Sequence, residues 1–172
     1  TFDGRGLFEL GQDAGAIDQA VEGFEKLDGA LTLYKKSDGG KTVLKLEVKK
    51  SQFGTAMMLQ TTASTGLADG RLTAGDPIND LVFEFRRLPN NRLAMYVPNY
   101  LYRADNNLAI ARAVRRSFPD SLVESFDIEA EQADRDSVLI DVSDMFRGDL
   151  GRVAEILAGG GNPILGGGGT PY

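Results

Sequence analysis

Short runs in which apolar and polar residues alternate recur along most of the chain. In the run TVLKLEVKK, Leu44, Leu46 and Val48 face one way, and Lys45 and Glu47 face the other. A period of two is typical of a β-strand that has one face on a core and one face in water. Comparable runs occupy residues 30–36, 80–88, 91–99, 121–131 and 137–144. The pattern therefore predicts a mostly antiparallel β-sheet.

The connections between these runs favour hairpins. The first two runs are joined through SDGG, and residues 80–88 are joined to residues 91–99 across PNN, both of which are typical turn sequences. Residues 54–65 are expected to form a further strand, and residues 100–105 to extend the meander. Residues 64–79, which contain Gly, Pro and several Asp, are expected to form a long loop.

Two or three short helices interrupt the predicted strands. Ile17, Val21 and Phe24 have helical spacing, and this helix is expected to stop at Gly29. A second helix is expected over residues 106–118, and a last one over residues 151–160. The second would carry an apolar stripe made of Ile110, Val114 and Phe118. Asp105 or Asn106 would be its N-cap.

The predicted fold class is α+β, made of a mostly antiparallel sheet of hairpins and meanders with two or three short helices. Residues 1–15 are expected to form a loosely held lead-in. Residues 16–158 are expected to form a single domain, because the 172-residue chain has room for one substantial core. Residues 159–172 are rich in Gly and are expected to form a flexible exit.

The absence of two reactive residue types limits the chemistry of the chain. The sequence has no histidine and no cysteine. It therefore cannot supply a Ser-His-Asp triad, an HExxH zinc site, a thiol nucleophile or a thiolate metal site. The motif GGKT at residues 39–42 lacks the earlier glycine of a phosphate-binding loop and lies between two predicted strands, so a hairpin turn is favoured.

Charge is distributed unevenly. Residues 35–50 hold six lysines against two acidic residues, whereas residues 120–149 hold ten acidic residues against two arginines. Solvated strand faces of opposite sign explain this pattern most simply, and a surface that docks another domain by complementary charge is the alternative. The formal net charge of −6 argues against nucleic acid as a partner. No apolar run is long enough for a membrane span.

Arginines on the second predicted helix form one candidate binding site. Arg112, Arg115 and Arg116 lie together away from the apolar stripe, with Arg103 and Arg92 expected near them. Such a cluster can bind a phosphate or a carboxylate. A solvated helix face is the plainer interpretation.

The stretch SVLIDVSDMFRGDL forms the second candidate site. Val138, Ile140 and Val142 are expected to point inward and Asp141 outward. Ser143 or Asp144 is expected to cap a short helical turn, with an Asp–Arg147 pair nearby and with Gly148 as a left-handed stop. The spacing of the aspartates does not match a calcium loop. A structural cap is therefore favoured over a metal site, and we predict no metal ligand and no catalytic residue.

Three segments in order carry a resemblance to a known family. They are KLDGALTLYKK, LAIARAVRRSFPDSLVESFDIEAE and VLIDVSDMFRGD. This order resembles a domain of unassigned function that precedes the catalytic domain in large bacterial zinc-dependent metalloproteases. The resemblance covers roughly residues 16–150, and its most specific part is residues 138–149.

The resemblance implies a noncatalytic N-terminal domain of a secreted or periplasmic peptidase. The implied partner is the catalytic domain of the same polypeptide, with a polypeptide substrate as a further partner. No cofactor is expected in this chain, because the zinc of such an enzyme would lie in its catalytic domain. A free-standing binding module with a charged docking face is the alternative. A carboxylate-based hydrolase would need Asp141 and Asp144 to converge in a cleft.

Overall fold

A computed structural model describes residues 15–66, 73–105 and 107–148 of the chain. The predicted lead-in, apart from Gly15, the last helix and the Gly-rich exit all lie outside the described residues. The described part contains eight strands in one sheet, with three short α-helices and a 3-10 turn at Lys50–Gln52. The α-helices are Ala16–Ala20 (α1), Ala111–Ser117 (α2) and Ser143–Arg147 (α3). No helix among the described residues is long and apolar enough to cross a membrane.

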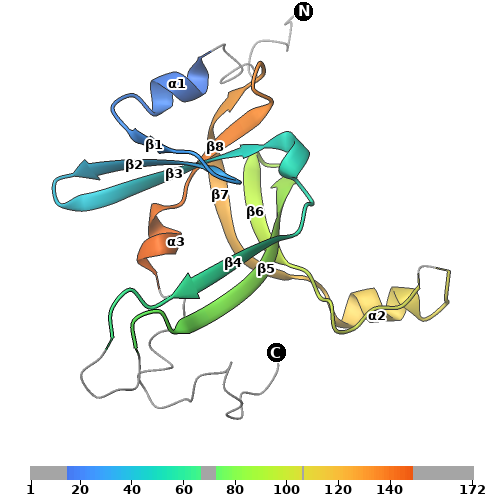
Figure 1. The fold of residues 1–172 in the computed structure, drawn as a ribbon. Coiled ribbons are helices and arrows are strands. Elements are labelled where there is room, and N and C mark those ends of the chain that lie inside the picture. Colours follow the sequence, from blue (N-terminus) through green and yellow to red (C-terminus); the bar gives the residue numbers. More distant parts are fainter. Residues whose placement is uncertain (1–14, 67–72, 106, 149–172) are drawn as a thin grey trace, which may run out of the picture.

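All neighbouring strands are antiparallel, and their spatial order is β1-β2-β3-β8-β7-β6-β5-β4. The strands are Glu25–Leu27 (β1), Thr32–Asp38 (β2), Lys41–Lys49 (β3), Met57–Thr62 (β4), Pro77–Leu88 (β5), Arg92–Val97 (β6), Ser121–Gln132 (β7) and Ser137–Asp141 (β8). The predicted β2–β3 and β5–β6 hairpins are confirmed. The simple chain of hairpins is corrected, because the sheet curls into a half-barrel in which β8 inserts beside β3 (Figure 1). Register shifts in the β4–β5, β6–β7 and β7–β8 pairs accompany this curl, since irregular pairing bends a strand.

The β2–β3 turn explains why GGKT is not a phosphate-binding loop. Gly39 and Gly40 have φ values of 54° and 82°, and they form the two-residue connection between β2 and β3. Positive φ at both positions is what a tight hairpin turn requires, and glycine adopts it without a steric penalty. The hairpin interpretation is confirmed.

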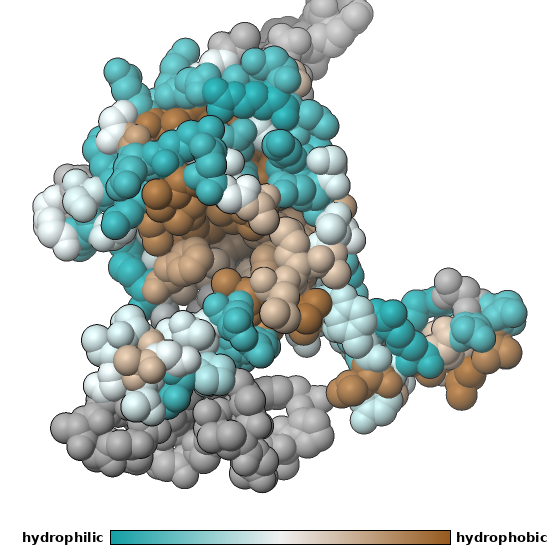
Figure 2. Space-filling model, in the orientation of Figure 1, coloured by the Kyte–Doolittle hydropathy of each residue, from teal (hydrophilic) through white to brown (hydrophobic). Residues whose placement is uncertain are grey.

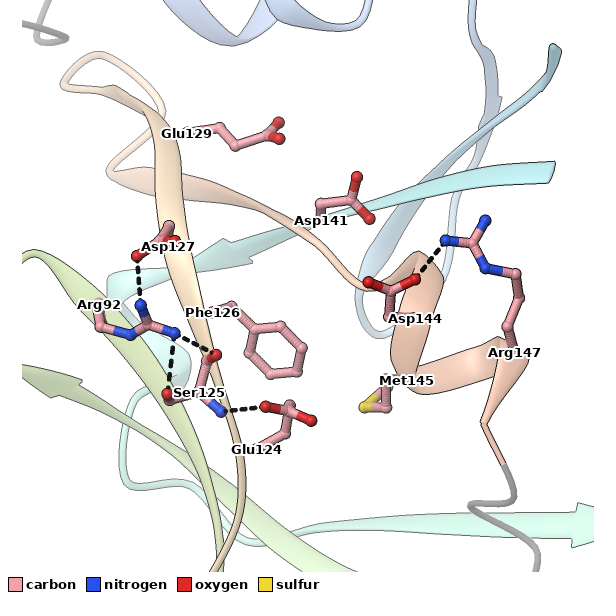
Figure 3. A pocket seen from close by; sticks show the side chains of 10 residues that line it. All are labelled: Arg92, Glu124, Ser125, Phe126, Asp127, Glu129, Asp141, Asp144, Met145 and Arg147. Atoms are coloured by element: carbon pink, nitrogen blue, oxygen red, sulfur yellow. Dashed lines mark hydrogen bonds and ion pairs between the residues drawn. The ribbon is translucent and has the colours of Figure 1, made fainter. Parts of the chain in front are cut away.

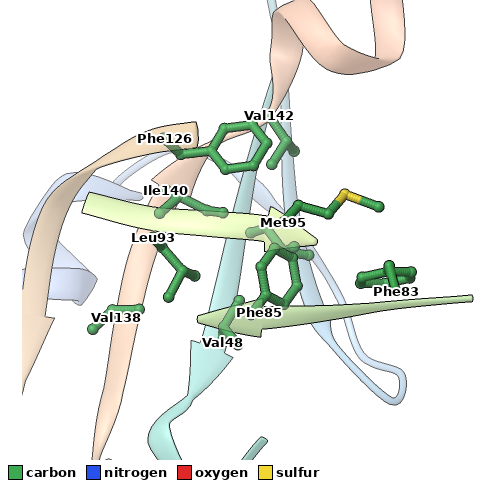
Figure 4. Packing of buried hydrophobic residues seen from close by; sticks show 10 residues of the cluster. Val48, Phe83, Phe85, Leu93, Met95, Phe126, Val138, Ile140 and Val142 are labelled. Carbon is green, nitrogen blue, oxygen red and sulfur yellow. The ribbon is translucent and has the colours of Figure 1, made fainter. Parts of the chain in front are cut away.

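The main core lies inside the half-barrel and is built by the alternating residues (Figure 4). Its buried members come from five strands and the residue that follows β8, and they are Leu46, Val48, Phe83, Phe85, Leu93, Met95, Phe126, Val138, Ile140 and Val142. The predicted inward sides of the β3, β5, β6 and β8 runs are therefore confirmed. Phe83 and Phe85 meet edge to face, with ring centroids 5.4 Å apart.

A second, smaller core lies on the outer face of the sheet, where α1 packs on β7 and β8. Ile17 of α1 meets Leu139 of β8 there, and both are fully buried. The Ile17 backbone N–H also donates to the Gln132 side-chain oxygen at 3.2 Å. The prediction that the Lys45 and Glu47 face of β3 lies in water is wrong at Glu47, which is 8% exposed.

Three further predictions are corrected. The first helix ends at Ala20 rather than at Gly29, and its predicted second half becomes a turn followed by β1. Residues 100–105 add no strand to the meander. The second helix begins at Ala111 and has Ile110 at its N-cap without a side-chain cap, so Asp105 does not cap it. Asn106 lies outside the described residues.

Candidate functional site

An acidic pocket of about 400 Å³ lies between β7 and α3 and contains the aspartates of the second candidate site (Figure 3). Phe126 and Met145 supply its apolar part. Its charged lining comes from β6, β7, β8 and α3, and it consists of Glu124, Asp127, Glu129, Asp141, Asp144, Arg92 and Arg147.

The carboxylates of this pocket already have partners within the chain. Asp127 pairs with Arg92 at 2.7 Å, and Asp144 pairs with Arg147. Glu129 pairs with Lys45 at 2.8 Å. Glu124 accepts from the Ser125 backbone N–H at 3.1 Å, and Asp141 from that of Ser143 at 2.7 Å. Each carboxylate that lines the pocket thus has a partner of its own within the chain.

Asp141 and Asp144 serve the local fold at the β8–α3 junction. The side chain of Asp141 accepts a hydrogen bond from the backbone N–H of Ser143, the first residue of α3. Asp144 follows Ser143, and its side chain is 96% exposed. Ser143 uses its hydroxyl oxygen to accept from the Leu44 backbone N–H at 2.9 Å, which ties α3 to β3. The predicted Asp–Arg147 pair is present. The predicted caps are corrected, because neither Ser143 nor Asp144 makes a side-chain cap bond and Gly148 has a φ of −74°.

Among the described residues, no group of three or more acidic side chains is arranged so that it could hold a metal ion. The carboxylate-hydrolase alternative needs two convergent carboxyls. Asp141 and Asp144 line the same pocket, but each already has a partner within the chain. The hydrogen bond from the Ser143 backbone N–H gives Asp141 a structural role at the start of α3, whereas Asp144 makes only an exposed ion pair with Arg147.

The first candidate site lies on an arm, here defined as residues 98–120, that protrudes from the half-barrel and carries α2 (Figure 1). The predicted apolar stripe does not pack on a core. Ile110 is 60% exposed and Phe118 is 43% exposed, and only Val114 is half-buried. Other exposed apolar residues of the arm are Tyr100, Leu101, Tyr102 and Leu108. This part of the molecule therefore displays apolar side chains that a folded chain normally buries.

The arginines predicted to cluster on α2 are all exposed. Arg115 lines a second pocket, of about 430 Å³, at the base of the arm, and Arg103 lines it too. Arg112 and Arg116 lie on exposed positions of α2 outside that lining. Arg92, expected near the cluster, lines the acidic pocket instead.

Ion pairs and aromatic contacts hold the base of the arm against the half-barrel. Arg86 of β5 pairs with Glu84 and with Asp120, and its guanidinium lies 4.7 Å from the centre of the Tyr96 ring. Tyr102 stacks on Phe118 with ring centroids 4.2 Å apart.

Asp120 closes the loop of the arm. It accepts a hydrogen bond from the Asn99 backbone N–H at 2.9 Å, so the two ends of the arm meet. This bond and the Arg86 guanidinium lower the pKa of Asp120 below its usual value. Asp120 is therefore held ionised as part of the structure of the arm base.

The uneven charge of the chain is partly neutralised within the fold. Because β3, β8 and β7 are neighbours, Lys45 of the basic segment reaches Glu129 of the acidic one, and Lys50 reaches Glu131 at 2.7 Å. These lysines and acids thus pair inside one molecule.

Arg86 and the aromatic residues at the base of the arm were not identified from the sequence. Arg86 lies in a strand pattern that predicts only alternation, and its partner Asp120 is 34 positions away. The signal in the sequence is the density of tyrosines around Pro98 in YVPNYLYR, although alternation alone favours a further strand over residues 100–105.

Comparison with known proteins gives one match. Residues 75–159 match a protein family. That family is described as Domain of unknown function (DUF5117). The DUF5117 match spans β5, β6, the arm, β7, β8 and α3, so it includes both candidate sites and leaves out α1 and β1–β4. No curated protein and no solved structure matches the chain.

Proposed function

We propose that this chain is a noncatalytic domain of a bacterial zinc-dependent metallopeptidase, and that it packs on the catalytic domain of the same polypeptide through its arm. The observation that carries the packing role is the exposed apolar surface of the arm. Leu101 is 76% exposed, Ile110 is 60% exposed and Tyr102 is 51% exposed. Contiguous apolar surface of this kind marks sites of protein interaction.

The composition of the arm fits a protein partner. Aromatic residues and arginines are enriched in protein interfaces, and the arm presents Tyr100, Tyr102, Phe118, Arg112 and Arg116. Because the exposed arginines lie beside the apolar residues, the surface that covers the arm is expected to be apolar with an acidic rim.

The peptidase part of the proposal is supported by the resemblance of three segments of this chain to the domain that precedes the catalytic domain in such enzymes. The most specific of them, residues 138–149, lies inside the DUF5117 match. Zinc would be bound by the catalytic domain, and we assign none of its ligands to this chain. A secreted or periplasmic location follows from the same resemblance.

The reading frame that follows Tyr172 distinguishes the two functional hypotheses. An HExxH sequence within the next few hundred residues would support the metallopeptidase, since its two histidines bind zinc and its glutamate acts as general base. A stop codon at that point would instead support the free-standing binding module. Zinc-dependent peptide cleavage by residues 1–172 alone would contradict a noncatalytic role.

Packing through the arm is tested by binding the chain to the separately produced remainder of the polypeptide. We expect Ile110→Asp and Leu101→Asp each to weaken this association at least tenfold, because each places a charge in an apolar contact. Met58→Asp is the matched control, since Met58 is 66% exposed but lies on β4, away from the arm. Equal effects of all three substitutions would overturn the arm as the packing surface.

A further inference from the structure

The pocket at the base of the arm, here called the arm pocket, lies between the arm and β5. Its volume of about 430 Å³ is within the range of roughly 300–1,000 Å³ that small-molecule sites occupy. Residues of the arm supply most of its lining, and Glu84 and Arg86 of β5 supply the rest. A group held in this pocket would contact the arm and the half-barrel together.

Aromatic rings form an apolar wall of the arm pocket. Tyr102 stacks on Phe118 with the ring planes 17° apart, and both line the pocket together with Tyr100. All three residues are exposed, so a ligand can reach them. Figure 2 shows the arm at the right, where apolar side chains lie beside hydrophilic ones. Flat rings pack well against another flat ring, so this wall suits a ligand that carries one.

Asn99 holds the arm pocket in shape. Its side-chain oxygen accepts hydrogen bonds from the backbone N–H groups of Leu101 and Tyr102, at 3.0 and 3.1 Å. Its side-chain amide donates to the Phe118 carbonyl oxygen at 3.2 Å, which joins the two sides of the arm. A site that is already ordered loses less conformational freedom when a ligand binds.

The charged lining of the arm pocket has one net positive charge. It contains three arginines, Arg86, Arg103 and Arg115, against two carboxylates, Glu84 and Asp120. Arg86 pairs with both carboxylates, so these acids already have a cation. A ligand with a single negative charge would balance the lining. A phosphate monoester carries roughly 1.5 to 2 negative charges at pH 7 and would exceed that balance.

Arg103 is well placed to bind the negative charge. Its guanidinium lies 4.4 Å from the centre of the Tyr100 ring, and its Nε donates to the Asn99 carbonyl oxygen at 3.3 Å. Within the described part of the chain, no carboxylate forms an ion pair with Arg103. A guanidinium that is oriented in this way can donate to both oxygens of a carboxylate.

We propose that the arm pocket binds a carboxylate that is attached to a flat apolar group. Arg103 binds the carboxylate, Arg115 adds a second positive charge to the lining, and Tyr102 and Phe118 contact the apolar group. The source of the ligand rests on the function proposed above. It is an aspartate or glutamate side chain, next to an aromatic residue, on the domain that packs on the arm.

Small aromatic ions test the chemistry of the arm pocket in the full chain. We expect phenylacetate at millimolar concentration to shift the amide NMR resonances of residues 99–104. Phenethylamine has a similar ring and the opposite charge, and it should bind at least tenfold more weakly. Acetate, which lacks the ring, should bind at least threefold more weakly, and the preference for phenylacetate over phenethylamine should shrink at high salt.

Three results with these probes would overturn the proposal. The first is the absence of shifts with phenylacetate, and the second is equal binding of phenylacetate and phenethylamine. The third is tighter binding of phenyl phosphate than of phenylacetate, which would contradict the charge balance of the lining.

Arginine variants test the role of Arg103 in phenylacetate binding. Arg103→Gln should weaken binding at least fivefold, whereas Arg103→Lys should have an intermediate effect, because lysine keeps the charge and loses the planar fork. Arg112→Gln is the matched control, since Arg112 is an exposed arginine of α2 outside the pocket lining, and it should change binding less than twofold. Equal effects of Arg103→Gln and Arg112→Gln would overturn Arg103 as the ligand of the carboxylate.

Binding to the separately produced remainder of the polypeptide tests the source of the carboxylate. Arg103→Gln should weaken this association at least threefold, and phenylacetate should compete with it. If Arg103→Gln weakens phenylacetate binding but not the association, the partner side chain is overturned as the source and the ligand is a free carboxylate.

Ile110→Asp separates the arm pocket from the packing role of the arm. Ile110 lies outside the pocket lining, so this substitution should weaken the association and leave phenylacetate binding unchanged. Phenylacetate binding that depends on Arg103, together with an association that Ile110→Asp does not weaken, would contradict the proposed packing and support the pocket. Loss of phenylacetate binding in Ile110→Asp would overturn the pocket as a separate site.

Discussion

Glu131 shows how single residues join distant parts of this chain. Its carboxylate accepts two hydrogen bonds from the Arg87 guanidinium, at 3.0 and 2.8 Å, and pairs with Lys50 at 2.7 Å. The Arg87 hydrogen bonds and the Lys50 ammonium lower the pKa of Glu131 to about 2. Glu131 is only 8% exposed, so water screens these contacts little, and the ionised carboxylate stabilises the fold.

This shift makes the stability of the protein depend on pH in the acid range. A carboxyl group whose pKa is lower in the folded state contributes stability above its unfolded pKa of about 4.5 and loses it as pH falls toward about 2. The contribution is on the order of 3 kcal/mol, at 1.36 kcal/mol per pKa unit. We expect Glu131→Gln to reduce the free energy of unfolding at pH 7 and to flatten its decline between pH 4.5 and 2.

Denaturant unfolding of both proteins across that pH range measures this effect. Asp134→Asn is the control, since Asp134 is exposed in the turn after β7. If the free energy of unfolding falls equally with pH in the original protein and in Glu131→Gln, the Glu131 carboxylate does not cause this pH dependence.

Tyr34 belongs to a second buried polar network, on the outer face of β3. Its hydroxyl donates to the Glu47 side chain at 2.8 Å, and the Ser137 hydroxyl donates to the other oxygen of the same carboxylate at 2.6 Å. Arg135 completes the network at 3.5 Å from Glu47 and also pairs with Asp18 of α1. Burial and the neighbouring Glu47 raise the pKa of Tyr34 to about 12.

Removing the Tyr34 hydroxyl should destabilise the protein. Tyr34→Phe is expected to cost about 1–2 kcal/mol of unfolding free energy, because a buried carboxylate loses one of its hydrogen-bond donors. Thermal and denaturant unfolding measure the loss. Tyr102→Phe, at a residue that is 51% exposed, should change stability by less than about 0.5 kcal/mol. Equal effects of the two changes would contradict the network.

Among the elements, β8 has the greatest influence on the fold. It lies between β3 and β7, and it is buried on both faces. Ile140 points into the half-barrel core, whereas Leu139 points to the outer face, where α1 covers it. One strand therefore serves two cores.

Truncation on either face of β8 should be costly. Leu139→Ala and Ile140→Ala are each expected to reduce the free energy of unfolding by about 2–5 kcal/mol, as for other fully buried aliphatic residues. Leu122→Ala is the control, because Leu122 of β7 is 54% exposed. A small effect of Leu139→Ala beside a large effect of Ile140→Ala would show that α1 does not form a true second core.

At the scale of the whole molecule, the arm is an addition to the half-barrel rather than part of its core. Its two ends meet where the Asn99 backbone binds Asp120, so the intervening residues can be bypassed by a short loop. Its apolar residues are exposed and contribute little to the main core.

Replacing residues 101–117 with a few glycines and serines should leave the half-barrel folded. We expect one cooperative unfolding transition with a melting temperature within about 5 °C of the original, since few buried contacts are lost. The same protein should no longer bind the remainder of the polypeptide. Loss of cooperative unfolding would instead show that the arm supports the core.

The sequence by itself determined most of the strands, but not β1, together with the inner faces of most of them and two hairpins. These features are local: alternation places Leu46, Val48, Phe83 and Phe85 on one side of their strands, and two glycines permit the tight β2–β3 turn. The Asp144–Arg147 pair was predictable for the same reason, because the two residues lie three positions apart.

Which part of the molecule covers each apolar face was decided only by the tertiary structure. The stripe of Ile110 and Phe118 has helical spacing whether or not a core lies beneath it, and in this fold it lies on a protruding arm. Alternation predicts the inward face of β8, but α1 covers its other face through a contact between residues 122 positions apart, Ile17 and Leu139. Pairing of the basic and acidic segments likewise required β8 to insert between β3 and β7, which brings Lys45 to Glu129. Local spacing fixes the direction of a side chain along its own element, whereas its partner depends on how the whole sheet curls.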